Sequence, residues 1–178
     1  MPNSSVQLDK KLNWLRASVL GANDGIVSVA GVVMGVAGAG AKLPAVLLAG
    51  IAALIAGAIS MAGGEYTSVS AQRDTELAHG RTASTLTANP WSAAFSSFVA
   101  FTVGALLPIF AISGPWQDQR EIATAISVVV ALALTGWWAA KVGKAPRLKS
   151  ILRNVVVSVL TMALAYIAGS ILGVTILA

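Results

Sequence analysis

The apolar positions of this chain fall into five long runs separated by polar links. The runs cover residues 15–39, 44–66, 91–112, 122–142 and 151–177. Each is at least about 20 residues long, the length that an α-helix needs to cross the hydrocarbon core of a bilayer. Aromatic residues stand near several run ends, as in interfacial belts: Trp14, Tyr66, Trp91, Trp116, Trp137 and Trp138. The pattern predicts an all-α integral membrane protein with five transmembrane helices.

The polar segments define the predicted domain organisation. Residues 1–14 form an N-terminal segment, and residues 15–178 form a five-helix transmembrane domain with a short link at 72–89. The first apolar run is longer than the roughly 7–15 residues of a signal-peptide core, and a polar segment precedes it. We therefore expect a retained first transmembrane helix.

Composition supports a membrane protein and removes several kinds of chemistry. Hydrophobic residues make up 56% of the chain and charged residues 11%, whereas soluble domains average about 25% charged residues. Cysteine is absent, which excludes disulfides and thiolate metal sites, and the single histidine, His79, excludes a multi-histidine site within one chain. No nucleophile–base pair is evident, so we do not expect an enzyme.

Lysine and arginine are unequally distributed between the two ends of the five predicted helices. Two of the twelve, Lys42 and Arg120, fall on one side, and the other ten fall on the side of the N-terminus. The ten are Lys10, Lys11, Arg16, Arg73, Arg81, Lys141, Lys144, Arg147, Lys149 and Arg153. Positive residues concentrate in cytoplasmic loops, so we expect a cytosolic N-terminus and an external C-terminus. The net charge of +5 therefore reflects topology, and we expect a lipid bilayer and no nucleic acid as partner.

Asp24 is a carboxylate inside the first apolar run, where the only other charge is Arg16 at the start. A charge near the middle of a membrane helix costs roughly 2.5–3.5 kcal/mol, and such residues usually mark ion or proton paths. A stripe of small residues borders Asp24 and directs it toward protein: Ala17, Gly21, Gly25, Ser28, Gly35 and Ala39. The alternative is a helix-breaking turn stabilised by Asn23 and Gly25.

Met61 and Glu65 lie four residues apart near the end of the second run and share a helix face. Asp24 lies about 13 Å into the first helix, and Met61 about 8 Å from the cytosolic end of the second. The two side chains can therefore line one cytosol-facing passage. A carboxylate is a hard ligand and a thioether a soft one, a combination that suits a passing site for Fe²⁺ or a similar ion. Met61 as core filler and Glu65 as an interfacial carboxylate remain open alternatives.

The link at 72–89 is the longest polar stretch of the chain. Its Asp74, Glu76 and His79 could in principle hold a metal ion. Their mixture with Arg73 and Arg81 favours a solvated helical extension instead.

Four segments resemble the vacuolar iron transporter family, which comprises plant and yeast vacuolar iron importers and their bacterial relatives. They are LGANDGIVS at 20–28, ISMAGGEY at 59–66, QRDTE at 72–76 and FTVGALLP at 101–108. The resemblance implies a homodimer of ten helices with an ion path at the dimer interface. It also implies exchange of cytosolic Fe²⁺, or Mn²⁺ in some members, for protons, with no permanently bound cofactor.

The resemblance assigns roles to three residues. Asp24 matches the aspartate of the first helix in the family's ion path, and Met61 matches the methionine of the second. Glu65 matches a glutamate common in bacterial-type members. The metal-path residues are thus predicted to be Asp24, Met61 and Glu65.

One departure from the family concerns metal capture. Many members carry a glutamate-rich cytosolic domain between helices 2 and 3, but here the link from Gln72 to Asn89 holds only two acids, Asp74 and Glu76. The link is too short for that domain, and Asn13 stands where an acidic residue of such a site is expected. The chain is therefore either a member that naturally lacks the capturing domain or a shortened one.

The expected function is proton-coupled transport of Fe²⁺, with Mn²⁺ as a second candidate, out of the cytosol. One alternative is a small-cation or drug exporter that uses Asp24 for proton coupling, although the first two helices have no aromatic residue between Trp14 and Tyr66. Another is a non-transporting membrane scaffold or metal sensor. A bacterial inner membrane is the default location, and a vacuolar membrane is expected if the source is eukaryotic.

Overall fold

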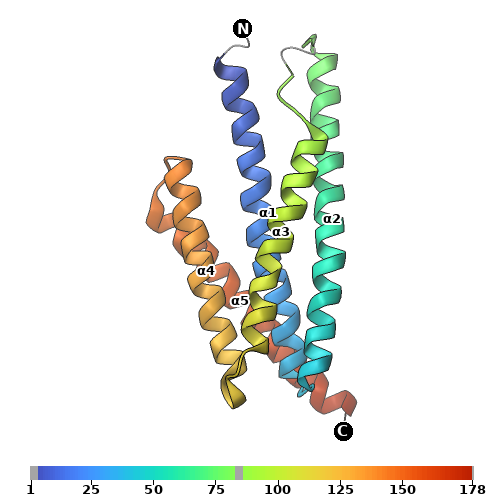
Figure 1. The fold of residues 1–178 in the computed structure, drawn as a ribbon, viewed down its shortest axis with the longest axis vertical. Helices are drawn as coiled ribbons and strands as arrows, with labels where there is room; N and C mark the ends of the chain where they lie inside the picture. Colours follow the sequence, from blue (N-terminus) through green and yellow to red (C-terminus); the bar gives the residue numbers. More distant parts are fainter. Residues whose placement is uncertain (1–3, 83–85, 178) are drawn as a thin grey trace.

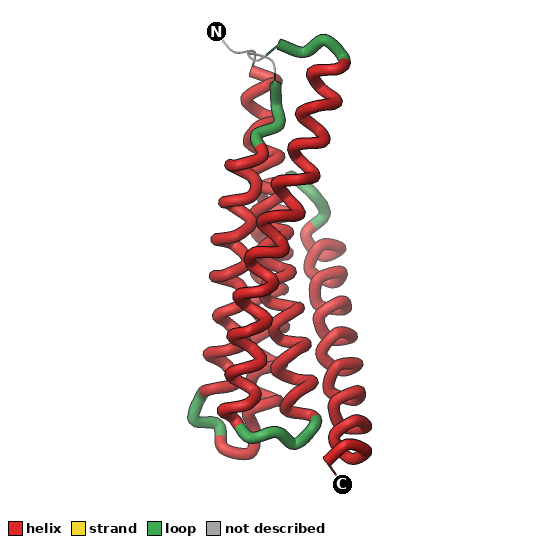
Figure 2. The backbone as a smooth tube through the Cα atoms, turned by 90° about the vertical axis from the view of Figure 1, so that its right-hand side faces the viewer, coloured by secondary structure: helices red, strands yellow, loops and turns green. Residues whose placement is uncertain are grey.

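The computed structural model of the protein is a bundle of five long α-helices, described for residues 4–82 and 86–177 (Figure 1). The helices are α1 (Ser4–Gly38), α2 (Leu43–Ala78), α3 (Pro90–Ser113), α4 (Arg120–Val142) and α5 (Arg147–Leu177), with a short 3-10 turn, η1 (Gln117–Gln119), before α4. Every α-helix is long and apolar enough to cross a membrane. Within the described ranges no residue forms a strand, as Figure 2 shows. The predicted all-α membrane fold with five spans is confirmed.

Two helices extend by more than ten residues beyond the apolar runs that predicted them. α1 begins at Ser4 and α2 continues to Ala78, so most of the predicted N-terminal segment and the first part of the 72–89 link are helical. At 1.5 Å per residue α2 is about 54 Å long, more than a bilayer core requires. The extension persists because residues 65–78 contain no proline or glycine. It ends beside Gly80, whose φ of +80° stops the helix.

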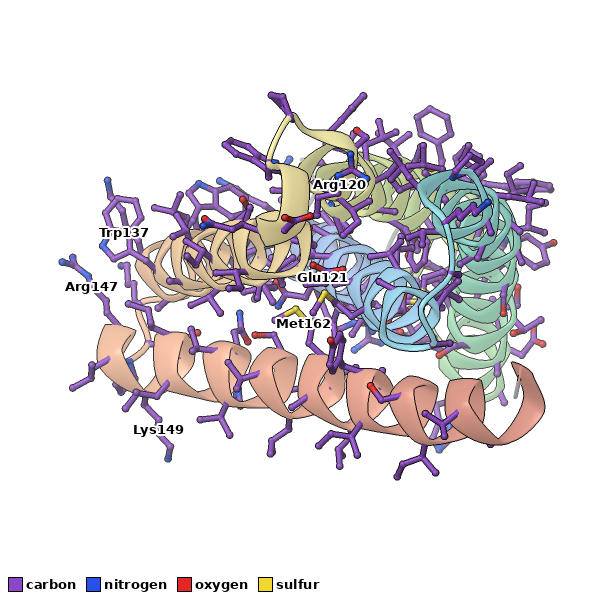
Figure 3. The ribbon with its side chains drawn as sticks, turned by 90° about the horizontal axis from the view of Figure 1, so that it is seen from below. Arg120, Glu121, Trp137, Arg147, Lys149 and Met162 are labelled. Atoms are coloured by element: carbon purple, nitrogen blue, oxygen red, sulfur yellow. The ribbon has the colours of Figure 1, made fainter. Side chains whose placement is uncertain are left out.

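One end of the bundle holds the N-terminus, the α2–α3 link and the α4–α5 turn (Figure 1). We call it the N-terminal end. α1 and α2 project beyond the α4–α5 turn there (Figure 1). At the α4–α5 turn, Trp137, Arg147 and Lys149 point outward from the bundle (Figure 3). The assignment of this end to the cytosol stays a prediction.

α1 is the central helix of the fold. Among the described residues it contacts each of the other four α-helices, whereas α2 packs only on α1 and α3, and α5 only on α1 and α4. The core is formed where α1, α3 and α4 meet, by Val29, Val33, Phe101, Val128 and Leu132. Met162 reaches into it from α5 (Figure 3). Residues placed on α1 can therefore face cavities on either side of the bundle.

Glycines bring α1 close to two neighbours. A Cβ added at Gly21 would lie 2.6 Å from the carbonyl oxygen of Ser97 on α3, and one at Gly25 would collide with the carbonyl oxygen of Phe101. A Cβ added at Gly173 of α5 would lie 2.6 Å from the carbonyl oxygen of Ala39. The first part of the predicted small-residue stripe of α1 thus packs against α3, and the last part packs against α5. Small residues allow such close approach between membrane helices.

Candidate functional site

A cavity of about 390 Å³ lies between α1, α2 and α3, and we call it the Asp24 cavity. The three residues predicted for the metal path, Asp24, Met61 and Glu65, all line it. Its other lining residues are Leu20, Ser28, Val32, Ala53, Gly57, Ser60, Gly64 and Phe101. The fold thus brings a carboxylate of α1 to the same space as a thioether and a carboxylate of α2.

The spacing of the residues explains why they converge. Leu20, Asp24 and Ser28 follow one another at intervals of four along α1, and Gly57, Met61 and Glu65 do so along α2. Residues four apart stand above one another on a helix face. The chain turns back between α1 and α2. The two rows therefore face each other and run in opposite directions. The mid-span position of Asp24 is therefore matched with the last membrane turns of α2.

The carboxylate of Asp24 is exposed within this chain, and it has no hydrogen-bond or ion-pair partner among the described residues. The backbone oxygen of Asp24 accepts a hydrogen bond of 2.6 Å from the Ser28 hydroxyl. α1 continues without interruption through residues 23–25, so the alternative of a helix-breaking turn is wrong. Asp24 is thus a carboxylate on a continuous helix, available to a ligand in the cavity.

Met61 has two contacts that bear on its role. It is partly buried and packs against the main core cluster, and it also lines the Asp24 cavity. Its sulfur can therefore contribute to a site without being removed from the packed interior. The core-filling alternative and the ligand interpretation are compatible at this position.

Glu65 is buried, with 6% of its side chain exposed, and it pairs with Arg16 of α1. Arg16 Nη1 donates to Glu65 Oε1 at 3.2 Å, and Nη2 donates to Oε2 at 3.0 Å. Both carboxylate oxygens therefore accept from one guanidinium in the bidentate geometry that arginine favours. The sequence prediction for Glu65 did not include Arg16. A signal was present, because Arg16 precedes Asp24 by two steps of four residues on the same face.

Phe101 lines the cavity, although no local sequence pattern assigned it to the site. It is 1% exposed, and its ring packs against α2 at Gly57, where an added Cβ would lie 2.8 Å from Phe101 Cε1. The ring therefore closes the α3 side of the cavity. The absence of a side chain at Gly57 makes room for it.

The opposite side of α1 carries a second polar contact. Thr135 Oγ1 on α4 donates a hydrogen bond of 2.9 Å to Asn23 Oδ1. A smaller cavity of about 280 Å³ lies there, and Asn23, Asp24, Arg153 and Asn154 are among the residues that line it. Asn23 thus fixes α1 against α4, next to the residue that faces α2.

Glu76 holds the α2–α3 link against α2. Its carboxylate accepts from the Thr87 backbone N–H at 2.9 Å, from the Thr87 hydroxyl, and from Gln72 Nε2 at 3.1 Å. Arg81 adds an ion pair at 3.6 Å. Within residues 4–82 and 86–177 no three His, Asp or Glu side chains gather as a metal site. The structure gives no support to the metal alternative for this link.

Comparison with known proteins relates the whole membrane domain to one family. The sequence model of the VIT family matches residues 15–87 and 76–170. Vacuolar iron transporter homolog 4 of Arabidopsis thaliana is 40% identical over 164 residues, which cover 88% of this chain and 83% of the relative. Homolog 3 of the same plant is 41% identical, with 88% and 82% covered. VIT-like transporter 1b of Glycine max is 31% identical over 190 residues, covering 98% and 83%.

The alignments cover most of this chain and most of each relative, including the short link between α2 and α3. Little of either sequence lies outside the alignments, so these relatives resemble the chain in having no large extra domain between helices 2 and 3. The membrane-length helices and these relatives make the protein an integral membrane protein. The extent of the family match and the identity to these relatives show that the chain belongs to the VIT family.

Proposed function

We propose that this protein transports Fe²⁺ across a membrane through the Asp24 cavity, out of the cytosol and in exchange for protons. The observation that carries the proposal is the convergence of Asp24 and Met61 on one cavity in a chain of the VIT family. Relatives named as vacuolar iron transporter homologs support iron as the cargo. Mn²⁺ is the second candidate cargo, because the same ligands accept it.

The ligand chemistry suits an ion that binds and leaves. Asp24 offers hard oxygen ligands and can also carry a proton, whereas Met61 offers a soft sulfur that Mg²⁺ and Ca²⁺ do not favour. Two protein ligands from two helices make a weak site, and weak binding permits release. In the proposed exchange Asp24 binds the metal ion in one state and a proton in the other. Glu65 lines the same cavity, and its role as a third ligand stays a prediction.

The N-terminal end is proposed to face the cytosol and the protein to act as a homodimer. Asp24 supports the second point, because it lines the cavity between α1, α2 and α3 and is exposed within this chain, where lipid would leave its charge unsolvated. A second copy placed over this cavity would enclose it. The membrane would be vacuolar in a eukaryotic source and the inner membrane in a bacterial one.

Flux through proteoliposomes tests this function. Purified protein is reconstituted with a pH gradient, and uptake of Fe²⁺, Mn²⁺, Co²⁺ and Zn²⁺ is measured for wild type, Asp24→Asn and Met61→Leu. We expect Fe²⁺ uptake that needs the gradient, loss of uptake in Asp24→Asn, and a weaker preference for Fe²⁺ over Mn²⁺ in Met61→Leu. Absence of flux for every metal, or an Asp24→Asn variant equal to wild type, would refute the proposal. Metal binding without flux would indicate a sensor or scaffold.

The ring of Phe101 favours one second candidate, an exporter of small organic cations. The first two helices contribute no aromatic residue to the membrane interior, but α3 brings Phe101 into the Asp24 cavity. An aromatic ring beside a carboxylate is suited to an organic cation. Tetraethylammonium added to the same liposomes separates the two functions, because an organic-cation exporter takes it up and a metal transporter does not.

A further inference from the structure

The ion pair of Arg16 and Glu65 lies at the N-terminal end of the Asp24 cavity. Arg16 precedes Asp24 by eight residues, which places it about 12 Å away along α1, and Glu65 stands one helical turn beyond Met61 on α2. An ion that moves between the N-terminal end and Asp24 therefore passes this pair. A permanent positive charge beside a cation path would repel the ion unless that charge is balanced.

The two partners differ in how far they are buried. Glu65 is 6% exposed and Arg16 49% exposed. The buried carboxylate has both oxygens occupied by the guanidinium at 3.0 and 3.2 Å, and no further partner among the described residues. The negative charge of this carboxylate is already balanced by the guanidinium, so a metal ion would have to compete with Arg16 for it. The arginine keeps half of its surface free and would repel an approaching divalent cation if it were unpaired.

We propose that Glu65 neutralises Arg16 and that the pair forms an electrically neutral clasp between α1 and α2 at the mouth of the path. In this role Glu65 acts on the ion through Arg16 and is a positioning residue. Asp24 and Met61 remain the ligands. The inference rests on the proposed function insofar as it concerns a cation passing the clasp. The clasp itself is a contact within the chain.

Removing the two charges singly and together separates this role from direct coordination of the metal ion. If Glu65 only neutralises Arg16, removing Glu65 alone leaves an unpaired positive charge, and removing both restores neutrality. If Glu65 is a ligand, removing Arg16 as well does not return the lost oxygen atoms. The variants are Glu65→Gln, Arg16→Gln, the double variant and Arg16→Lys, which keeps the charge without the bidentate geometry.

Initial rates of Fe²⁺ uptake are measured in proteoliposomes across a range of metal concentrations. We expect Glu65→Gln to slow uptake by about tenfold, the low end of electrostatic effects on cation access, mainly through a higher KM. Arg16→Gln/Glu65→Gln is expected to return to within about threefold of wild type, and Arg16→Lys to stay in the same range. The control is Glu65→Gln/Arg73→Gln, which removes an exposed arginine of α2 and should remain slow.

A double variant as slow as Glu65→Gln, with both proteins folded, would overturn the clasp and favour Glu65 as a ligand. Equal rescue by Arg73→Gln would also overturn it, since the effect would then be general surface charge. If wild type transports no metal, the proposed function fails and thermal unfolding in detergent decides the clasp. Coupling between Arg16→Gln and Glu65→Gln supports it, and strictly additive losses of stability refute it.

Discussion

Gly25 and Gly57 both face Phe101, but they meet different parts of it. A Cβ at Gly25 of α1 would collide with the Phe101 carbonyl oxygen and lie 3.0 Å from its Cα, so it meets main chain. A Cβ at Gly57 of α2 would lie 2.8 Å from Cε1 and 3.2 Å from Cε2, so it meets the ring. A smaller side chain at position 101 can therefore relieve the second clash and not the first.

The expected cost of each alanine follows from two opposing effects. Overpacking a tight interior costs about 1–3 kcal/mol, and replacing glycine by alanine in a helix returns about 1 kcal/mol. Because the Gly25 contact with α3 is far inside van der Waals distance, we expect Gly25→Ala to lose a net free energy of unfolding of about 2 kcal/mol. That corresponds to a fall in Tm of about 4–8 °C for a chain of this size. Gly57→Ala should fall by a similar amount.

Thermal unfolding in one detergent, followed by the fluorescence of the five tryptophans, measures these differences. The variants are Gly25→Ala, Gly57→Ala, Phe101→Leu and the two double variants. Gly63→Ala is the matched control, because a Cβ there meets nothing within 4 Å, and it should not lower the Tm. Phe101→Leu is expected to rescue Gly57→Ala and to leave the loss in Gly25→Ala unchanged.

Two outcomes would show that the reasoning is wrong. If Gly25→Ala unfolds at the same temperature as Gly63→Ala, the close approach of α1 and α3 is not a tight main-chain contact. If Phe101→Leu rescues both alanine variants equally, the two clashes do not differ as main chain and ring. Either result would also contradict the conclusion that these two glycines hold Phe101 at the wall of the Asp24 cavity.

Two further predictions concern polar contacts outside the ion path. Glu76→Gln removes the charge that Thr87 and Arg81 contact, and since hydrogen bonds to charged groups contribute about 1.5–3 kcal/mol, the Thr87 amide should exchange at least about tenfold faster by hydrogen exchange. Asp74→Asn, an exposed acid on the same stretch, should leave that rate unchanged. Thr135→Val removes the hydrogen bond to Asn23 and should lower the unfolding free energy by about 1 kcal/mol. Among the described residues the Thr161 hydroxyl contacts only a carbonyl of its own helix, so Thr161→Val should cost less. Equal losses in the two variants would contradict the α1–α4 contact.

The five helices were predictable because the length of an apolar run is enough to indicate a membrane span. The beginning of α1 and the end of α2 were not predictable in this way. Their polar extensions carry no apolar signal, and only the lack of breakers before Gly80 marks the helical continuation of α2. The convergence of Asp24 and Met61 on one cavity followed from depth and face. The pair of Arg16 and Glu65 did not, because its partners are 49 residues apart and their contact depends on the rotation of both helices. The wall formed by Phe101 depended on α3 and was likewise beyond local patterns.

The two carboxylates of the Asp24 cavity are in opposite states, and that difference bears on which of them takes part in exchange. Glu65 already has a permanent cation, Arg16, at 3.0 Å, so it needs neither a proton nor a metal ion to be neutralised inside the membrane. Asp24 has no such partner among the described residues, and a bare charge at its depth is costly. A proton neutralises that charge and a metal ion pairs with it, and each must displace the other from the same carboxylate. In the proposed transport cycle one unpaired aspartate is therefore sufficient to couple the two ions, and the paired glutamate keeps the mouth of the path neutral in both states.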